Sequence, residues 1–416
     1  MLNIAVLGYG VVGSGVVDLI QQKNPGIKSR LGKGITVKKI LDIRDFSNDP
    51  NKELITQNPD EILQDESIRI VVETIGGTGF AYDMTKRALK AGKSVVTSNK
   101  ELVATHGPEL LALAAENDVS YLFEASVGGG IPIIRPLHNC LAANDIYSIT
   151  GILNGTTNYI LTAMNKKGKA FSEALKEAQL NGYAEADPTA DIEGHDACRK
   201  IAILSSIAYN QFVDYRDIET EGISRVSPDD FYYADLLGGT IKLIGESRRM
   251  NDGIYAKVHP AILDNNHPLS HVDDVFNAIL VEGDAVGDAM FYGKGAGRLP
   301  TASAVVADIL DIMKKNHSQT ATGVWDYHRK AWVLNRPEAN SQLYVRMEGI
   351  KDTAALKDLV AQEFGQARFY ENLEKPGQLV FVTEVNGALG IRQCASRMES
   401  FGYTPAIVLQ MMDRKG

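Results

Sequence analysis

The sequence predicts an α/β protein of three domains, and three observations lead to this prediction. Residues 1–140 alternate short apolar runs with amphipathic stretches, an alternation typical of a parallel sheet covered by helices on both faces. From about Ile146 this rhythm changes, which predicts a second, α+β domain at 141–320. After a polar, turn-prone break at 336–340, the order strand, helix, strand, strand, helix, strand predicts a ferredoxin-like domain at 341–416.

The composition narrows the class of protein. The chain has 416 residues, of which 44% are hydrophobic and 23% charged, so a mostly disordered protein is excluded. The net charge of −9 and the lack of a basic run argue against nucleic acid or an anionic membrane as a partner. Because we find no apolar run of about 18 residues and no targeting signal, we expect a cytoplasmic protein without membrane spans. The cysteines Cys140, Cys198 and Cys394 lie far apart, which predicts neither a disulfide framework nor a zinc site.

The first domain is expected to contain five buried strands with helices between several of them. A helix at 81–91 should end at Gly92, because glycine adopts the left-handed conformation of a C-terminal cap at little cost. The triplets Asn24-Pro25-Gly26 and Gly32-Lys33-Gly34 predict a loop before the second strand rather than a longer first helix. The strands are expected at 4–7, 37–41, 70–72, 95–97 and 121–123.

The second and third domains mix strands and helices. Two apolar runs separated by Gly283 and Gly287 predict a β-hairpin. A glycine-rich run precedes a helix near Pro300, and part of 295–320 could complete the first domain. In the second domain, strands are expected at 146–153, 278–281 and 289–292 and helices at 156–165, 172–181 and 195–209. In the third, strands are expected at 343–347, 367–370, 378–385 and 404–409 and helices at 353–363 and 388–400.

A glycine-rich motif follows the first predicted strand and opens an apolar helix. The residues Gly8-Tyr9-Gly10-Val11-Val12-Gly13 satisfy G-x-G-x-x-G, and in this context the motif predicts dinucleotide binding on a Rossmann-type, doubly wound sheet. Gly8 allows the tight turn, Gly10 lets the backbone approach the pyrophosphate, and Gly13 allows close packing of helix on strand. The alternative is a glycine turn that serves packing alone.

The choice of dinucleotide stays open. An acidic residue at the end of the second strand, Asp42, would bind the ribose hydroxyls of NAD. Arg44, two residues later, could instead pair with the 2′-phosphate of NADP. These residues alone do not decide between the two; from the place of Arg44 just past the second strand we expect NADP as cofactor, with NAD possible.

The central block from Ala178 to Lys200 resembles the signature of homoserine dehydrogenases at every specified position. It carries four acids in a turn-rich loop, and Asp196 and Lys200 then share one face of a helix at i, i+4. By itself this pair could equally be a solvated or a partly buried ion pair. Further segments resemble the same family, and together the matches cover roughly residues 1–320. They are Thr97-Ser98-Asn99-Lys100-Glu101, Asn154-Gly155-Thr156-Thr157-Asn158-Tyr159-Ile160, and Gly295-Ala296-Gly297 with Pro300-Thr301-Ala302-Ser303.

The resemblance implies NAD(P)-dependent interconversion of L-homoserine and L-aspartate 4-semialdehyde, in the biosynthesis of threonine, methionine and isoleucine. Lys200 matches the proton donor of the family, helped by Asp196, and Lys100 matches the active-site lysine beside the nicotinamide. An ammonium group suits that place because negative charge grows on the substrate oxygen during hydride transfer. The other matching positions contact the substrate (Glu185, Asp191, Asp196, Gly155, Thr156 and Tyr183) or the cofactor (Gly182 and Gly297).

The run from Glu124 to Ile131 resembles a cation-binding segment of the family. There a glutamate and the backbone groups that match Val127, Gly129 and Ile131 bind a monovalent cation, usually sodium. A carboxylate with several carbonyl oxygens suits a hard cation of low charge. Without the resemblance, the run would be interpreted as a flexible hinge after the fifth strand.

Residues from about 341 resemble the ACT regulatory domain, which commonly senses an amino acid such as threonine. ACT domains usually place Asp-x-Pro-Gly after their first strand, whereas this chain has Gly349-Ile350-Lys351-Asp352-Thr353-Ala354. We therefore expect weak or no inhibition by threonine. The alternative role is dimerisation through exposed strand edges, and we expect a homodimer or homotetramer. Two other functions stay open: a different amino-acid dehydrogenase, such as one for aspartate, and a catalytically silent dinucleotide sensor.

Overall fold

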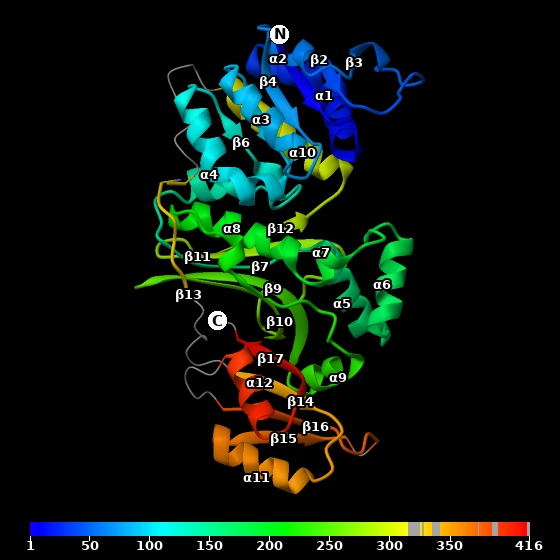
Figure 1. The fold of residues 1–416 in the computed structure, drawn as a ribbon, viewed down its shortest axis with the longest axis vertical. Helices are drawn as coiled ribbons and strands as arrows, with labels where there is room; N and C mark the ends of the chain where they lie inside the picture. Colours follow the sequence, from blue (N-terminus) through cyan, green and yellow to red (C-terminus); the bar gives the residue numbers. More distant parts are fainter. Residues whose placement is uncertain (315–324, 327, 335–341, 373, 385–389, 414–416) are drawn as a thin grey trace.

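The computed structural model describes residues 1–314, 325–326, 328–334, 342–372, 374–384 and 390–413 (Figure 1). Along the longest axis of the molecule, an N-terminal sheet lies at one end, a mixed sheet in the middle and a smaller α/β unit at the other end (Figure 1). The break predicted at 336–340 lies outside the described residues. No helix of the described part is both long and apolar enough to cross a membrane.

The N-terminal sheet confirms the predicted doubly wound fold. Its strands lie in the order β3-β2-β1-β4-β5-β6 and all pair in parallel. Helix α1 packs on one face and helices α3 and α4 on the other. The strands are β1 (Leu2–Leu7), β2 (Ile35–Leu41), β3 (Ile55–Thr56), β4 (Ile68–Glu73), β5 (Ser94–Thr97) and β6 (Tyr121–Leu122). The helices are α1 (Val11–Leu31), α2 (Asp60–Leu63), α3 (Phe80–Lys90) and α4 (Lys100–Glu116), with a 3₁₀ turn η1 (Lys52–Leu54).

The loop predicted at Asn24-Pro25-Gly26 is wrong, because helix α1 continues through it to Leu31. Pro25 removes only one backbone donor, and Ile27 beyond it is buried in the same core as the start of the helix. The Asn24 side chain bonds both the N–H and the C=O of Ile35, at 2.9 and 2.8 Å, and so holds the start of β2 against the helix. The predicted break at Gly32 is confirmed, since Gly32 caps the helix with φ +70°.

A helix from much later in the chain completes the packing of the first sheet. Helix α10 (Arg298–Lys314) lies against α1, and its Ala302 and Val305 are fully buried in the core formed by β1 and α1. In Figure 1 this yellow helix lies among the blue elements of the N-terminal sheet. This packing supports the expectation that part of 295–320 completes the first domain, although the domain boundaries themselves stay a prediction.

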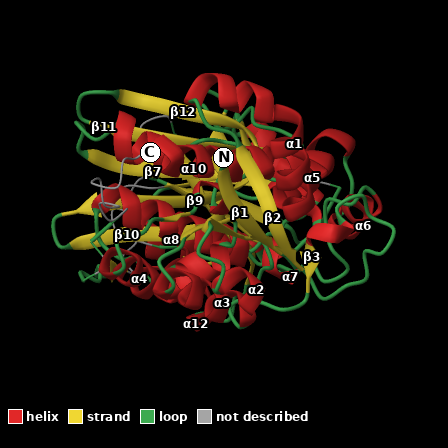
Figure 2. Cartoon of the chain, turned by 90° about the horizontal axis from the view of Figure 1, so that it is seen from above, coloured by secondary structure: helices red, strands yellow, loops and turns green. Residues whose placement is uncertain are grey.

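The middle of the molecule is a long mixed sheet whose strands run in a different direction from β1 and β2 (Figure 2). The predicted hairpin is confirmed as β11 and β12, with Gly283 opposite Gly287. A second, longer hairpin, β9 and β10, was not predicted, because polar residues such as Glu246 and His259 are buried in it and hide the alternation of a strand. The strands are β7 (Ile146–Ile152), β8 (Glu219–Thr220), β9 (Gly239–Met250), β10 (Gly253–Asp264), β11 (Phe276–Gly283), β12 (Gly287–Lys294) and β13 (Val333–Leu334).

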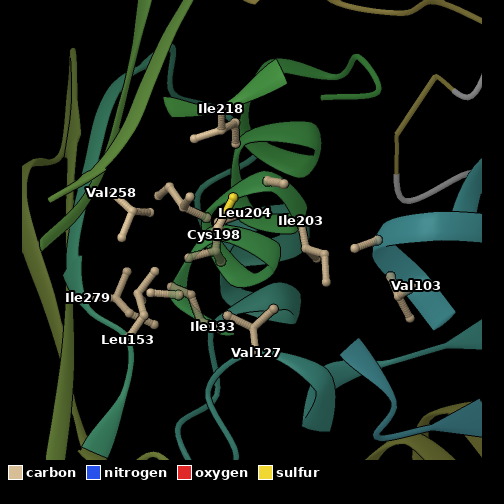
Figure 3. Close-up of a cluster of buried hydrophobic side chains, with 14 of the residues drawn as sticks. Val103, Val127, Ile133, Leu153, Cys198, Ile203, Leu204, Ile218, Val258 and Ile279 are labelled. Carbon is tan, nitrogen blue, oxygen red and sulfur yellow. The ribbon is translucent and has the colours of Figure 1, made fainter. Parts of the chain in front are cut away.

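Helix α8 covers this sheet on the side of the N-terminal unit (Figure 1), and Figure 3 shows the apolar side chains that pack between α8, α4 and the strands. The helix predicted at 195–209 is confirmed as α8. The helices are α5 (Gly155–Lys167), α6 (Phe171–Leu180), α7 (Thr189–Ile192), α8 (His195–Tyr209) and α9 (Pro228–Leu236). Short turns complete the set: η2 (Glu124–Ser126) and η4 (Tyr215–Asp217) are 3₁₀ and η3 (Pro136–Cys140) is π-helical.

The C-terminal unit has the predicted ferredoxin-like order. Its strands lie in the sequence β17-β14-β16-β15, and helices α11 and α12 pack with them around a separate core. The first strand of this list also pairs in parallel with β10, so the unit continues the middle sheet. The elements are β14 (Gln342–Met347), α11 (Thr353–Phe364), β15 (Ala367–Glu371), β16 (Leu379–Thr383), α12 (Ile391–Ser400) and β17 (Pro405–Met412).

A buried ion pair also joins the C-terminal unit to helix α9. Asp230 accepts hydrogen bonds from Arg346 at 2.7 and 3.1 Å and from the Tyr344 hydroxyl at 2.9 Å. It also accepts the backbone N–H of Ser227 and so caps α9. Asp230 and Arg346 are almost completely buried, and the other carboxylate that Arg346 contacts, Glu348, is exposed, so Asp230 is the buried compensation of the guanidinium.

Asp230→Ala should therefore lower the free energy of unfolding by roughly 3–5 kcal/mol, because it leaves the buried guanidinium of Arg346 with only the exposed carboxylate of Glu348 as a partner. Urea unfolding followed by circular dichroism measures this loss. Glu61→Gln is the control, because it removes an exposed ion pair with Lys39 (2.7 Å) worth no more than about 1 kcal/mol. Equal losses in the two variants would contradict the role of the buried pair.

Candidate active site

The glycine motif forms a tight turn between β1 and α1, in the context that the sequence predicts. Gly8 has φ +88°, a conformation that side chains disfavour. A Cβ at Gly13 would lie 1.9 Å from the carbonyl oxygen of Gly8, so only glycine allows this approach of helix to strand. Helix α1 begins at Val11 without a side-chain cap, which leaves backbone N–H groups free to meet a phosphate.

Beside this turn, Asp42 and Arg44 form an ion pair at the carboxyl end of β2. The Nε and Nη2 atoms of Arg44 bond the two oxygens of Asp42 at 3.0 and 2.7 Å, and the backbone N–H of Tyr9 donates to Asp42 at 2.7 Å. Hydrogen bonding from Arg44 is the main reason why the pKa of Asp42 is lowered. The guanidinium also lies 5.1 Å from the ring of Phe46 and is more than half exposed. The two residues proposed to select the cofactor therefore lie in direct contact, and the guanidinium of Arg44 compensates the negative charge of Asp42.

The structure brings Lys100, Asp196 and Lys200 together. The Asp196 carboxylate lies between the two ammonium groups, 2.7 Å from Lys100 Nζ and 2.8 Å from Lys200 Nζ. Asp196 and Lys200 are buried one turn apart on α8, whereas Lys100, the first residue of α4, is partly exposed. The Lys200 ammonium also donates to the carbonyl of Leu153 at 2.8 Å. The buried alternative for the Asp196–Lys200 pair is therefore confirmed.

The charges of this group shift one another's ionisation. Burial alone would raise the pKa of Asp196, but the charges of Lys200 and Lys100 outweigh it and the pKa is lowered. The same attraction to Asp196 raises the pKa of Lys100. Asp196 is therefore a permanent carboxylate that holds both ammonium groups in place.

Asp191 joins the group through Asn154. The side-chain amide of Asn154 donates to Asp191 at 2.7 Å and to Asp196 at 2.9 Å, while its oxygen accepts the N–H of Thr157 and caps helix α5. Burial and the nearby charge of Asp196 raise the pKa of Asp191. The sequence analysis assigned Asn154 no role; its place directly before a predicted helix is the signal of a helix cap.

Of the other residues proposed for substrate and cofactor contact, Gly155 and Thr156 directly follow Asn154 at the start of α5. Thr156 donates its hydroxyl to the carbonyl of Tyr183 at 2.7 Å, and the exposed ring of Tyr183 lies 4.9 Å from that of Tyr159. Gly155 begins α5, and a Cβ there would lie 2.8 Å from the carbonyl oxygen of Val275. Among the described residues, the exposed Glu185 forms no ion pair with Lys100 or Lys200, both of which pair with Asp196. Gly182 and Gly297 have φ +73° and +116°, in turns that favour glycine.

Glu73 is a site residue that sequence reasoning missed. Its buried carboxylate, at the end of β4, accepts the Thr97 hydroxyl at 2.6 Å and the N–H groups of Ile75 and Gly76 at 2.8 and 3.2 Å. Burial raises its pKa. Next to it, Asn99 caps helix α4 by accepting the N–H of Leu102 at 3.0 Å. These bonds fix the loops at the carboxyl ends of β4 and β5, and so position Lys100.

Glu124, expected as a cation ligand, has its carboxylate oxygens engaged. Ile133 and Ile134 donate their N–H groups to Oε1 at 2.7 and 2.8 Å, and Arg135 donates its N–H and its side chain to Oε2 at 2.8 and 3.2 Å. Four donors fill about the four lone-pair sites of a carboxylate. A cation bound by this carboxylate therefore does not fit the structure, and only backbone carbonyls of the segment remain as ligands. Nearby, burial raises the pKa of Asp308 to about 8.

Comparisons with known proteins identify the family of this chain. Family models described as "Homoserine dehydrogenase, NAD binding domain" and "Homoserine dehydrogenase" match residues 8–124 and 132–310. The homoserine dehydrogenase of Neisseria gonorrhoeae is 41% identical over 86% of this chain and 85% of its own length. The crystal structure of a homoserine dehydrogenase from Thiobacillus denitrificans has a TM-score of 0.88 at 35% identity and covers 99% of this chain and 98% of that one.

A further structure similar to this chain is a hyperthermophilic archaeal homoserine dehydrogenase in complex with NADPH, with a TM-score of 0.64 at 30% identity. It covers 75% of this chain and 97% of that one. These similarities support homoserine dehydrogenase over the alternative of an aspartate dehydrogenase. The chain belongs to the homoserine dehydrogenase family and is an oxidoreductase with an NAD(P)-binding domain of the Rossmann type.

Proposed function

We propose that the protein interconverts L-homoserine and L-aspartate 4-semialdehyde by hydride transfer, in the biosynthesis of threonine, methionine and isoleucine. The observation that carries this proposal is the ion group in which the buried Asp196 and Lys200 meet the partly exposed Lys100. It places two ammonium groups at the junction of the dinucleotide-binding sheet and helix α8. An oxygen that gains negative charge there would be stabilised by these groups.

In the proposed mechanism, Lys200 exchanges a proton with the hydroxyl oxygen of the substrate. Its Nζ is held by Asp196 and by the carbonyl of Leu153, so the direction of its remaining N–H bond is restricted. Lys100 adds a second positive charge, while Asp196 remains a carboxylate and orients both. The bound nicotinamide, when present, supplies or accepts the hydride.

Carboxylates beside the lysines suit the ammonium group of an amino-acid substrate. We assign this role to Asp191 and Glu185, with Gly155, Thr156 and Tyr183 lining the same pocket. Asp191 is held by Asn154 at 2.7 Å, and the hydroxyl bond from Thr156 to Tyr183 fixes the turn that follows α6. Glu185 is exposed, so it would act as a flexible arm rather than a preformed contact.

For the cofactor we propose NADP, with NAD as a second substrate. The backbone of Gly8 to Gly13, including Tyr9, Val11 and Val12, would hold the pyrophosphate, with Gly182, Gly297 and Lys100 towards the nicotinamide. Arg44 neutralises Asp42, and its exposed guanidinium retains donors for a 2′-phosphate. The archaeal relative with bound NADPH supports this choice.

We propose three further assignments. A sodium ion at 124–131 would be held by the carbonyls of Glu124, Val127, Gly129 and Ile131, without the carboxylate. The C-terminal unit would act as an ACT-like module with weak or no response to threonine. A homodimer or homotetramer is the proposed assembly.

The direct test of the reaction is spectrophotometric. Purified protein mixed with L-homoserine should reduce NADP⁺, with a slower reaction for NAD⁺, and absorbance of the reduced nicotinamide reports the rate. L-aspartate in place of homoserine should give no signal. Reduction with aspartate alone would overturn the proposed substrate.

Lys200→Ala should cut kcat for homoserine by about 10²–10⁴, the usual contribution of a positioned acid or base. Binding of NADP should change little, because the pyrophosphate lies at the glycine turn. Lys200→Arg should rescue poorly, since guanidinium keeps the charge but does not release a proton in the working pH range. Steady-state kinetics measure both variants, and near-full turnover of the arginine variant would move the proton-transfer role to Lys100.

Arg44→Ala should raise the Michaelis constant for NADP by about one to two orders of magnitude, because a charge-assisted contact contributes roughly 1.5–3 kcal/mol. The constant for NAD should change little. Arg69→Ala is the control, since this exposed arginine lies at the amino end of β4, away from the cofactor edge. Equal losses with both cofactors would show that Arg44 acts on the loop rather than on the 2′-phosphate.

A further inference from the structure

A cavity of about 550 Å³ lies against a different face of α8 from the one that carries Asp196 and Lys200. It is lined by the first turns of α8, by residues 215–220 and by Arg392 at the start of α12. His195, Cys198 and Arg199 face it at spacings of three and four residues, as expected for one side of a helix. Figure 3 shows Cys198 on α8 with Ile218 close to it, both of which line the cavity. The volume is that of a small-molecule site.

Three guanidinium groups face this cavity, and they retain donors that no described residue accepts. The Nε atom of Arg199 is buried without a hydrogen-bond partner in the described part of the chain. Its Nη2 lies 3.6 Å from Glu101, which is too long for a hydrogen bond, and its guanidinium lies 5.4 Å from the ring of Tyr215. Arg392 is mostly exposed and contacts Glu219 through Nε at 3.3 Å. Arg216 binds Asp214 through Nε and Nη2.

The carboxylates of the cavity are already compensated by lysines outside it. Asp217 pairs with Lys330 at 2.9 Å, and Glu219 pairs with Lys257 at 3.3 Å. The unsatisfied groups are therefore donors rather than acceptors. Guanidinium groups with free donors match the oxygens of carboxylate and phosphate.

We propose that this cavity binds a small organic oxyanion, a metabolite with a carboxylate or phosphate group, and that Arg199 transmits its binding to the active site. Two ion pairs join neighbouring residues of α8 and α4: Asp196 with Lys100 at 2.7 Å, and Arg199 with Glu101 at 3.6 Å. An oxyanion bound to Arg199 competes with Glu101 for the guanidinium. The Arg199–Glu101 pair is then lost, and of the two pairs only Asp196–Lys100 still joins α8 to α4. The start of α4, which carries Lys100, is then held less firmly, and turnover falls.

The binding part is tested by isothermal titration calorimetry on the full chain with NADP⁺ saturating, so that phosphate does not occupy the glycine turn. Citrate and inorganic phosphate are the probes, with L-threonine as a zwitterion for comparison. At least one oxyanion should bind, and Arg199→Gln and Arg392→Gln should each weaken it about ten-fold or more. Arg69→Gln, a matched exposed arginine elsewhere, should bind as the unaltered protein does.

Each outcome of the titration either supports or overturns the proposed oxyanion site. Binding of citrate alone indicates a polycarboxylate, binding of phosphate alone indicates a phosphate ester, and both support the proposed class. No oxyanion binding, binding of threonine only, or equal affinity in all four proteins overturns the site.

The coupling part rests on the proposed homoserine reaction. The oxyanion that binds should lower kcat roughly two- to five-fold, the range expected for loss of one partly exposed ion pair. Glu101→Gln should keep the binding but lose this response, because the competing partner of Arg199 is gone. An unchanged kcat on binding contradicts the coupling while leaving the site intact. Absence of any homoserine turnover refutes the proposed function, and the calorimetric result still stands by itself.

Discussion

The ion group of Asp196 with Lys100 and Lys200 is the interaction on which the rest of the site depends. One carboxylate, buried on α8, binds an ammonium from its own helix and another from the first residue of α4. Because α4 follows a strand of the N-terminal sheet and α8 packs on the middle sheet, this contact joins the two units at their junction. Burying such charges is costly unless they are mutually compensated, so the group stays intact only when both units are in place.

The positions of these charges are set by ordinary backbone features. Asn99 and Asn154 cap the helices that follow β5 and β7, and each also ties its helix to another part of the site. Glu73 satisfies the backbone of the turn after β4. The return of α10 to the first sheet closes the arrangement, since the chain leaves that sheet near Glu124 and comes back at Arg298, where Asp308 accepts the N–H of Glu124. Asn99, Asn154, Glu73 and Asp308 therefore hold the backbone in place, and we assign none of them a part in the reaction itself.

Much of this could be predicted from sequence, wherever local chemistry and tertiary context agree. Gly8 to Gly13 must form a turn because of its glycines, and the apolar face of 195–209 specifies α8. Prediction failed where packing overrides local preference. Helix α1 continues past Pro25 because Ile27 is buried beyond it. The strands β9 and β10 were not predicted because the polar residues Glu246 and His259, paired at 2.8 Å, occupy buried positions where an apolar residue is expected. The roles of Glu73 and Glu124 depend on backbone N–H groups, whose positions are invisible in a sequence.

The parallel pairing of β17 with β10, at Ala261–Leu263, has a mechanical consequence. A regulatory domain on a flexible linker can rotate freely. Here the C-terminal strands belong to the same hydrogen-bonded sheet as β9, β7 and β11. A movement of the C-terminal strands relative to β10 must therefore either change the twist of the shared sheet or break the main-chain hydrogen bonds between β17 and β10. Loss of the unit would also leave Ala261–Leu263 of β10 without their main-chain partners and open to pairing with other chains. The C-terminal unit is thus a structural part of the middle sheet, and a ligand bound to this unit could act on the rest of the protein through that sheet.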